Sequence, residues 1–91
     1  MAHTVTLLQS QLAQYPSVHH WLADQLQLPE HYGHNLDALW DCLTGYVSLP
    51  LHIEWQQDCD DHTDYSKFIQ LFEEAAAEVD GLSFRYITTQ Q

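Results

Sequence analysis

Apolar residues recur along this chain at two spacings, one typical of strands and one typical of helices. Leu51, Ile53 and Trp55 alternate with His52 and Glu54, so the segment 49–55 is predicted to be a strand with one buried side. Short, mainly apolar or alternating runs predict two further strands, at 5–8 and 82–87.

Two segments in the first half of the chain carry apolar residues at helical spacing. The segment 18–28 is predicted to be a helix that ends at Pro29, because the residue before a proline disfavours helical geometry. The segment 35–44 is predicted to be a second helix with Asn35 as its N-cap. We expect Gly45 to close this helix in the left-handed conformation.

A third helix is predicted over 65–79, capped by Thr63 or Asp64. The aspartate-rich run 56–64 before it has no periodicity and is interpreted as a solvated connection. The resulting order is strand, two helices, strand, loop, helix, strand. It predicts a single α/β domain over 1–91, with a small three-stranded parallel sheet packed against three to four helices.

The helix predicted over 35–44 also carries candidate chemistry. Leu36, Leu39 and Leu43 form its apolar stripe, while Asp37 and Asp41 lie four residues apart on a different face. Like charges at this spacing destabilise a helix by a few tenths of a kcal/mol. A cationic partner would explain both carboxylates, and the alternative is a solvated helix face.

The charge of the chain narrows the choice of partner. Thirteen acidic residues oppose two Lys or Arg, which gives a formal net charge of −11. Such a field repels nucleic acid and anionic membranes and attracts basic proteins. The sequence has no apolar run of membrane-spanning length and no signal-type N-terminus, so a cytoplasmic location is expected.

The segment 28–54 resembles the barstar family, in its Leu-Pro-Glu, Tyr-Gly, Asn-Leu-Asp-Ala-Leu-Trp-Asp-Cys-Leu-Thr-Gly and Leu-x-x-Glu-Trp elements. The family comprises intracellular inhibitors of a secreted bacterial ribonuclease. The resemblance implies a barstar-like fold and a one-to-one complex with a barnase-like ribonuclease, formed by a chain that is monomeric when free. It also implies that acidic side chains take the place of RNA phosphates in the enzyme's cleft.

The resemblance assigns roles to particular residues. Asp41 is the principal anchor and Asp37 supports it, while Glu74 pairs with a cation at the rim. The remaining implied contacts lie in the loop and helix around these acids and comprise His31, Tyr32, Gly33, Asn35, Leu36, Trp40 and Tyr46. Packing is the alternative role for Tyr32 and Trp40, and a solvated face is the alternative for Glu74.

Two histidines depart from the family pattern. His31 occupies a position where the family has tyrosine, and His34 one where an acidic residue is usual. A protonated histidine would oppose a cationic cleft, so we expect binding to weaken as the pH falls through the histidine range.

Other chemistries have weaker support. The pairs Cys59-x-x-His62 and His31-x-x-His34 lack a second pair at zinc-site spacing, so no metal or cofactor is predicted. Cys42 is expected to be a free thiol near the core, and the sequence offers no catalytic constellation, so the protein is not predicted to be an enzyme. The alternatives are a barstar-like immunity or regulatory module with a partner other than a ribonuclease, and a histidine-rich metal sensor.

Overall fold

The computed structural model of the chain describes residues 3–30, 32–58, 60–61 and 63–88. Its strands are β1 (His3–Leu8), β2 (Leu51–Gln56) and β3 (Leu82–Ile87), which form one parallel sheet in the order β1-β2-β3. Its helices are α1 (Val18–Leu26), α2 (Leu36–Gly45) and α3 (Ser66–Glu78). The predicted α/β fold is confirmed. A short 3-10 helix over Gln9–Gln14 was not predicted.

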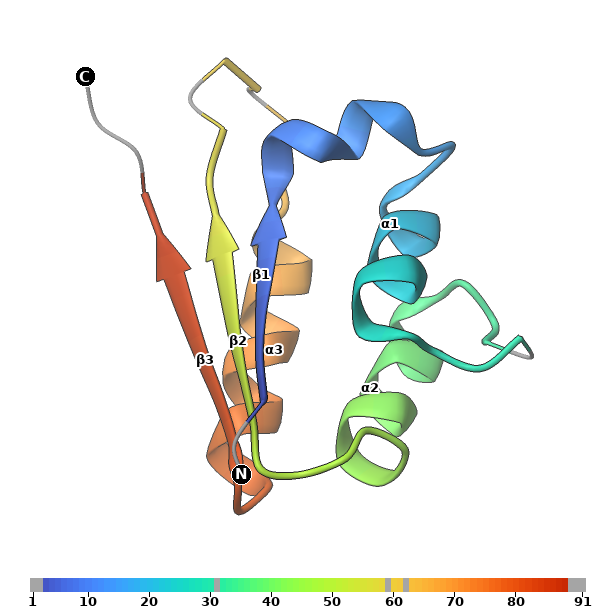
Figure 1. Cartoon of the computed structure of the whole chain (residues 1–91), viewed down its shortest axis with the longest axis vertical. Helices are drawn as coiled ribbons and strands as arrows, with labels where there is room; N and C mark the ends of the chain where they lie inside the picture. The colour runs from blue at the N-terminus through green and yellow to red at the C-terminus, as the bar shows by residue number, and fades with distance from the viewer. Residues whose placement is uncertain (1–2, 31, 59, 62, 89–91) are drawn as a thin grey trace.

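The sheet directs one face toward the helices. The predicted alternation of β2 is confirmed, because Leu51, Ile53 and Trp55 are buried and the residues between them are half-buried. In register, Ile53 lies between Val5 of β1 and Phe84 of β3. In Figure 1, α3 runs behind the sheet, α1 lies beside β1, and α2 packs against α3.

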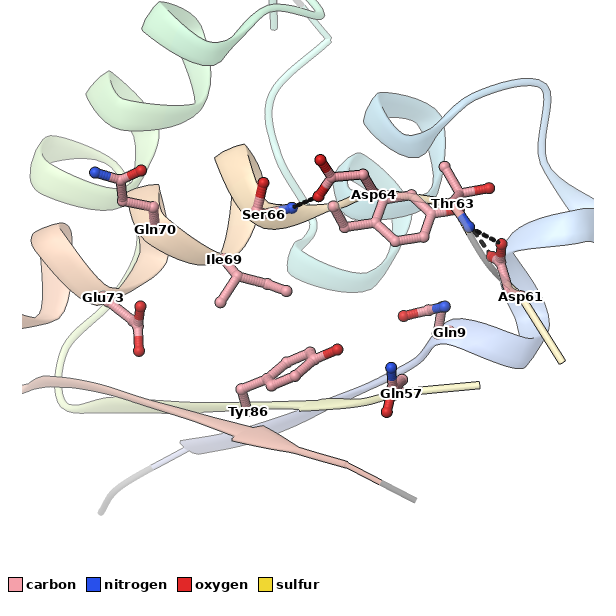
Figure 2. Close-up of a pocket in the computed structure, with 11 residues that line it drawn as sticks. Gln9, Gln57, Asp61, Thr63, Asp64, Ser66, Ile69, Gln70, Glu73 and Tyr86 are labelled. Atoms are coloured by element: carbon pink, nitrogen blue, oxygen red, sulfur yellow. Dashed lines mark hydrogen bonds between the residues drawn. The ribbon is translucent and has the colours of Figure 1, made fainter. Parts of the chain in front are cut away.

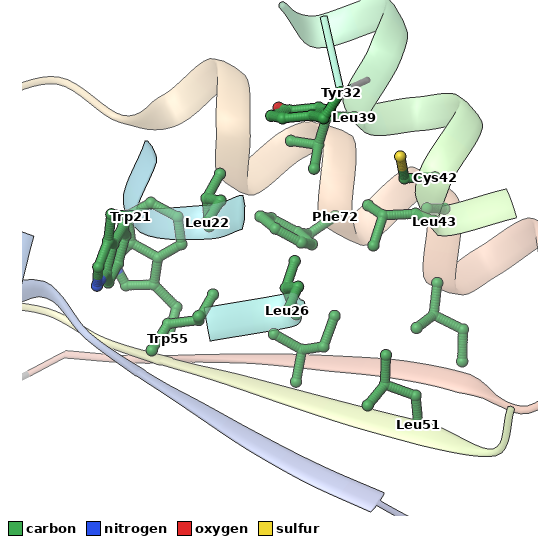
Figure 3. Close-up of a cluster of buried hydrophobic side chains, with 14 of the residues drawn as sticks. Trp21, Leu22, Leu26, Tyr32, Leu39, Cys42, Leu43, Leu51, Trp55 and Phe72 are labelled. Atoms are coloured by element: carbon green, nitrogen blue, oxygen red, sulfur yellow. The ribbon is translucent and has the colours of Figure 1, made fainter. Parts of the chain in front are cut away.

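Aromatic rings fill the centre of the core. Trp21 of α1 meets Trp55 of β2 edge to face, with ring centroids 5.1 Å apart. Phe72 of α3 lies among side chains from α1, α2 and β2 (Figure 3), and its ring stacks on that of Phe84. The Trp55 indole N–H donates to Oε1 of Gln9, at 2.8 Å. The buried side chain of Gln9 therefore has a hydrogen-bond partner inside the core.

The ends of two helices differ from the predictions. The left-handed conformation predicted for Gly45 is wrong, because Gly45 is the last helical residue and Tyr46 ends α2 with φ of −112°. The amides of Tyr46 and Val47 both donate to the Cys42 carbonyl, so no left-handed residue is needed. The α1 helix ends two residues before the predicted end, where Gln27 adopts φ of 54°.

The start of α3 is held by a residue outside the helix. The N-cap position belongs to Tyr65, whose side chain makes no capping bond, so the predicted cap residues are wrong. The Asp64 carboxylate nevertheless accepts a hydrogen bond from the amide of Ser66, at 2.9 Å. Asp64 therefore satisfies one of the free amides of the first turn without occupying the cap position.

Candidate partner-binding site

The loop before α2 is tied to the helix by one side chain. Asn35 is the N-cap, as predicted, and its Oδ1 accepts from the amide of Ala38 at 2.7 Å. The Asn35 amide nitrogen donates to the Gly33 carbonyl at 3.2 Å. A single residue thus satisfies a free amide of α2 and fixes the backbone that leads into it.

Gly33 fits this arrangement because it has no side chain. A Cβ atom at this position would lie 3.3 Å from Nδ2 of Asn35 and 3.4 Å from Cβ of Ala38. The Asn35 amide would have to move by a few tenths of an ångström to admit it. Gly33 therefore has a packing role in the loop, beside the partner contact that the resemblance implies.

A groove of about 340 Å³ separates the exposed surfaces of α2 and α3. It brings together four of the predicted site residues, Leu36, Asp37 and Trp40 from α2 and Glu74 from α3. Asp37 and Glu74 are exposed, whereas Leu36 and Trp40 are half-buried. The groove thus combines apolar walls with two carboxylates that are distant in sequence.

Asp41 is exposed on α2, one turn after Asp37, and it does not line the groove. Among the described residues, neither aspartate has a hydrogen bond or ion pair. The neighbouring Cys42 is buried and free, as predicted. Its burial raises the pKa of its thiol, and the negative charge of Asp41 raises that pKa further. The face of α2 that carries the two aspartates is therefore available to a partner.

Three residues of the groove were not predicted, and all lie on α3: Lys67, Gln70 and Leu71. Gln70 precedes Glu74 by one helical turn, and its amide nitrogen donates to Oε1 of Glu74 at 3.3 Å. Lys67 lies on the same face one turn earlier. Helical spacing from Glu74 was the available signal for both residues.

Tyr46 lies apart from the groove. Its side chain is 52% exposed and lines a separate hollow of about 530 Å³ at the start of β1, with His3, Val5 and Leu26 among its neighbours. Tyr46 remains a predicted contact that the structure does not bring together with Asp37 and Glu74.

Aromatic rings support the other side of the loop. The ring of His34 stacks on that of His20, with centroids 4.6 Å apart and an interplanar angle of 17°. His34 has φ of 53°, an uncommon conformation for a residue with a side chain. Tyr32 is buried, in line with its packing alternative, and its hydroxyl is 2.7 Å from Nδ1 of His19. His31 lies outside the described residues.

His19 is the most enclosed of these histidines. Its ring packs on Phe68 of α3, with centroids 5.3 Å apart, and lies 6.4 Å from that of His34. Burial lowers the pKa of His19, and the charges of His34 and His20 lower it further. No sequence pattern indicated that the α1 histidines would meet the loop, because this contact depends on tertiary packing.

A larger cavity, of about 580 Å³, opens near the carboxyl ends of the strands (Figure 2). Asp61, on its wall, accepts hydrogen bonds from the amide of Thr63 and the hydroxyl of Tyr65, both at 2.9 Å. The hydrogen bond from the Thr63 backbone amide is the main reason why the pKa of Asp61 is lowered. The Asp61 carboxylate thus helps to organise the connection between β2 and α3.

Within the described ranges, no group of three His, Cys, Asp or Glu side chains is arranged to hold a metal ion. Cys59 and His62 lie outside those ranges. The same part of the chain contains no helix that is both long and apolar enough to cross a bilayer.

Comparison with known proteins extends the similarity across the chain. A family model described as Barstar (barnase inhibitor) matches residues 2–89. A protein of Bacillus subtilis (strain 168) named "Putative ribonuclease inhibitor YrdF" is 65% identical over 34 residues. That alignment covers 37% of this chain and 37% of the relative, well under two thirds of the relative's length.

Proposed function

The chain belongs to the barstar family, and from this we propose that it inhibits a basic, secreted ribonuclease by covering the active site with α2 and the loop before it. The observation that carries the proposal is the groove in which Asp37, Trp40 and Glu74 meet. The relative named as a ribonuclease inhibitor supports the same activity.

Asp41 is the proposed anchor. A ribonuclease needs cationic side chains to hold RNA phosphates and to stabilise the charge that develops on them. An exposed carboxylate without an internal partner can accept charge-assisted hydrogen bonds from such arginine or histidine side chains. Asp41 meets this requirement, since it is exposed near the middle of a well-capped helix.

The groove is proposed to receive a second cationic side chain, at the rim of the cleft. Asp37 and Glu74 supply negative charge from both helices, while the Trp40 ring and the Leu71 side chain offer apolar surface for an aliphatic stem. The hydrogen bond from Gln70 holds the Glu74 carboxylate in place before binding.

The net charge is proposed to speed encounter with the ribonuclease. With −11 charges, the chain attracts a basic protein over distances of about a Debye length. Association between oppositely charged proteins can approach about 10⁸ to 10⁹ M⁻¹s⁻¹ at low salt, and it slows steeply as salt is added. We propose a one-to-one complex that protects the cytoplasm of the producing cell.

Titration into a barnase-type ribonuclease digesting RNA tests the proposal. The wild-type chain should abolish activity at a one-to-one ratio, and Asp41→Ala should fail to do so at the same concentrations. Asp80→Ala is the matched control, because it removes an exposed carboxylate from the turn between α3 and β3, outside the groove. An absence of inhibition at micromolar concentrations would contradict the proposal and favour a partner of another kind.

A further inference from the structure

The groove between α2 and α3 contains a positive charge that simple mimicry of RNA does not explain. Lys67 lines it together with Asp37 and Glu74. The chain has two Lys or Arg residues in total, and the other is Arg85 on β3. A cation at this place opposes the cationic rim that the two carboxylates attract.

Pairing within the chain does not account for Lys67. No ion pair joins its ammonium to any residue in the described part of the chain. The Glu74 carboxylate instead accepts from the neutral amide of Gln70. Lys67 does help to lower the pKa of Asp64, but it ranks last among the causes, after the hydrogen bonds from Ser66. Lys67 is exposed, so its charge is available to a partner.

We propose that Lys67 recognises a carboxylate on the ribonuclease, next to the cation that enters between Asp37 and Glu74; this inference rests on the proposed function. The groove then presents two negative charges and one positive charge to its partner. Its complement is a rim that carries a basic and an acidic side chain side by side. Lys67 is thus a specificity-determining residue.

Specificity of this kind arises from attraction and repulsion together. A matching carboxylate contributes a modest amount, because exposed ion pairs are weak. A basic ribonuclease with a cation at the same point meets like-charge repulsion and loses affinity. The chain would then discriminate among ribonucleases whose overall charge is similar.

The test measures the affinity of Lys67→Ala and Lys67→Glu for a barnase-type ribonuclease that the wild-type chain inhibits. Simple charge mimicry predicts that both variants bind more tightly, since each makes the surface more negative. The proposal predicts the opposite sign, with affinity lowered about threefold by Lys67→Ala and further by Lys67→Glu.

Arg85→Ala is the matched control for net charge. Arg85 is exposed on β3 and lies outside the groove, so the variant removes one positive charge without touching the site. Its affinity should equal that of the wild type or slightly exceed it. Replacing the ribonuclease's rim carboxylates by amides, one at a time, should identify one position at which Lys67→Ala has no further effect.

Tighter binding by Lys67→Ala, or equal effects of Lys67→Ala and Arg85→Ala, would overturn the inference. So would the failure of every carboxylate replacement to abolish the effect of Lys67→Ala. Each of these three results leaves the proposed function intact if Asp41→Ala still abolishes inhibition. If the wild-type chain inhibits no such ribonuclease, the proposed function fails and the role of Lys67 fails with it.

Discussion

The aspartates of α2 and those of the loop before α3 are the same residue type in two different settings. In the loop, Asp58, Asp61 and Asp64 each accept a hydrogen bond from the backbone amide two residues ahead. On α2, Asp37 and Asp41 have no hydrogen bond or ion pair with a described residue. The loop carboxylates hold the backbone of the connection, whereas those of α2 make no such contact.

The largest expected effect is on binding through α2. Asp41→Ala should weaken ribonuclease binding by about 2 kcal/mol or more, because cationic groups of the partner would stay buried without their acceptor. It should change the free energy of unfolding by less than about 0.5 kcal/mol, since no described residue depends on this carboxylate. Calorimetric titration and urea unfolding measure the two quantities, and a large loss of stability would contradict the comparison.

The reverse outcome is expected in the loop. Asp61→Ala should lower the free energy of unfolding by about 1–2 kcal/mol, because the Thr63 amide and the Tyr65 hydroxyl lose their acceptor. Ribonuclease affinity should be unchanged. Asp60→Ala removes an exposed neighbouring carboxylate and should leave urea unfolding unaltered.

The dependence of the unfolding free energy on acid pH should reveal the contribution of Asp61. Its pKa is lowered in the folded state, so its stabilising contribution is present above the ordinary value of 3.8 and disappears as the pH falls through the folded-state pKa. The wild type should therefore lose more stability below that value than Asp61→Ala does. Parallel curves of unfolding free energy against pH for the two proteins would argue against this role.

Alanine substitutions at two glycines should change the stability of the protein in opposite directions, each by a moderate amount. Gly33→Ala should destabilise the protein by about 1 kcal/mol, because its Cβ would press on the Asn35 amide and disturb the hydrogen bonds of this N-cap. Gly45→Ala should instead stabilise it by about 0.5–1 kcal/mol, since Gly45 is helical and nothing lies within 4 Å of its Cβ position. Thermal unfolding distinguishes the two, and equal shifts would contradict the packing role of Gly33.

The smallest expected effect is a pH dependence near neutrality. His19 is faced by His20 on its own helix, by His34 and Tyr32 from the loop, and by Phe68 from α3. Because its folded-state pKa is lowered, protonation favours the unfolded state, and stability should fall as the pH drops below 6.5. His19→Gln should flatten the stability profile there, whereas His3→Gln, on an exposed position of β1, should not.

The fold was readable from the sequence where structure depends on near neighbours. The alternation in β2 and the capping of α2 by Asn35 involve residues within a few positions of one another, so local spacing predicts them. The groove joins Asp37 to Glu74, and the aromatic contacts join His20 to His34, through tertiary packing. The family resemblance supplied Glu74, whereas the only signal for Lys67 was its helical spacing from Glu74. The end of α2 was mispredicted because two amides share one carbonyl there.

The hydrogen bonds of Asn35 have a consequence for the entropy of binding. Since this side chain holds Gly33 on one side and Ala38 on the other, the backbone from Gly33 to the start of α2 is already held in place in the free protein. Association therefore requires little further loss of backbone freedom, a loss of roughly 1–2 kcal/mol for each residue that has to be immobilised. The segment 33–38 should keep its conformation in a complex, with backbone displacements of about 1 Å or less.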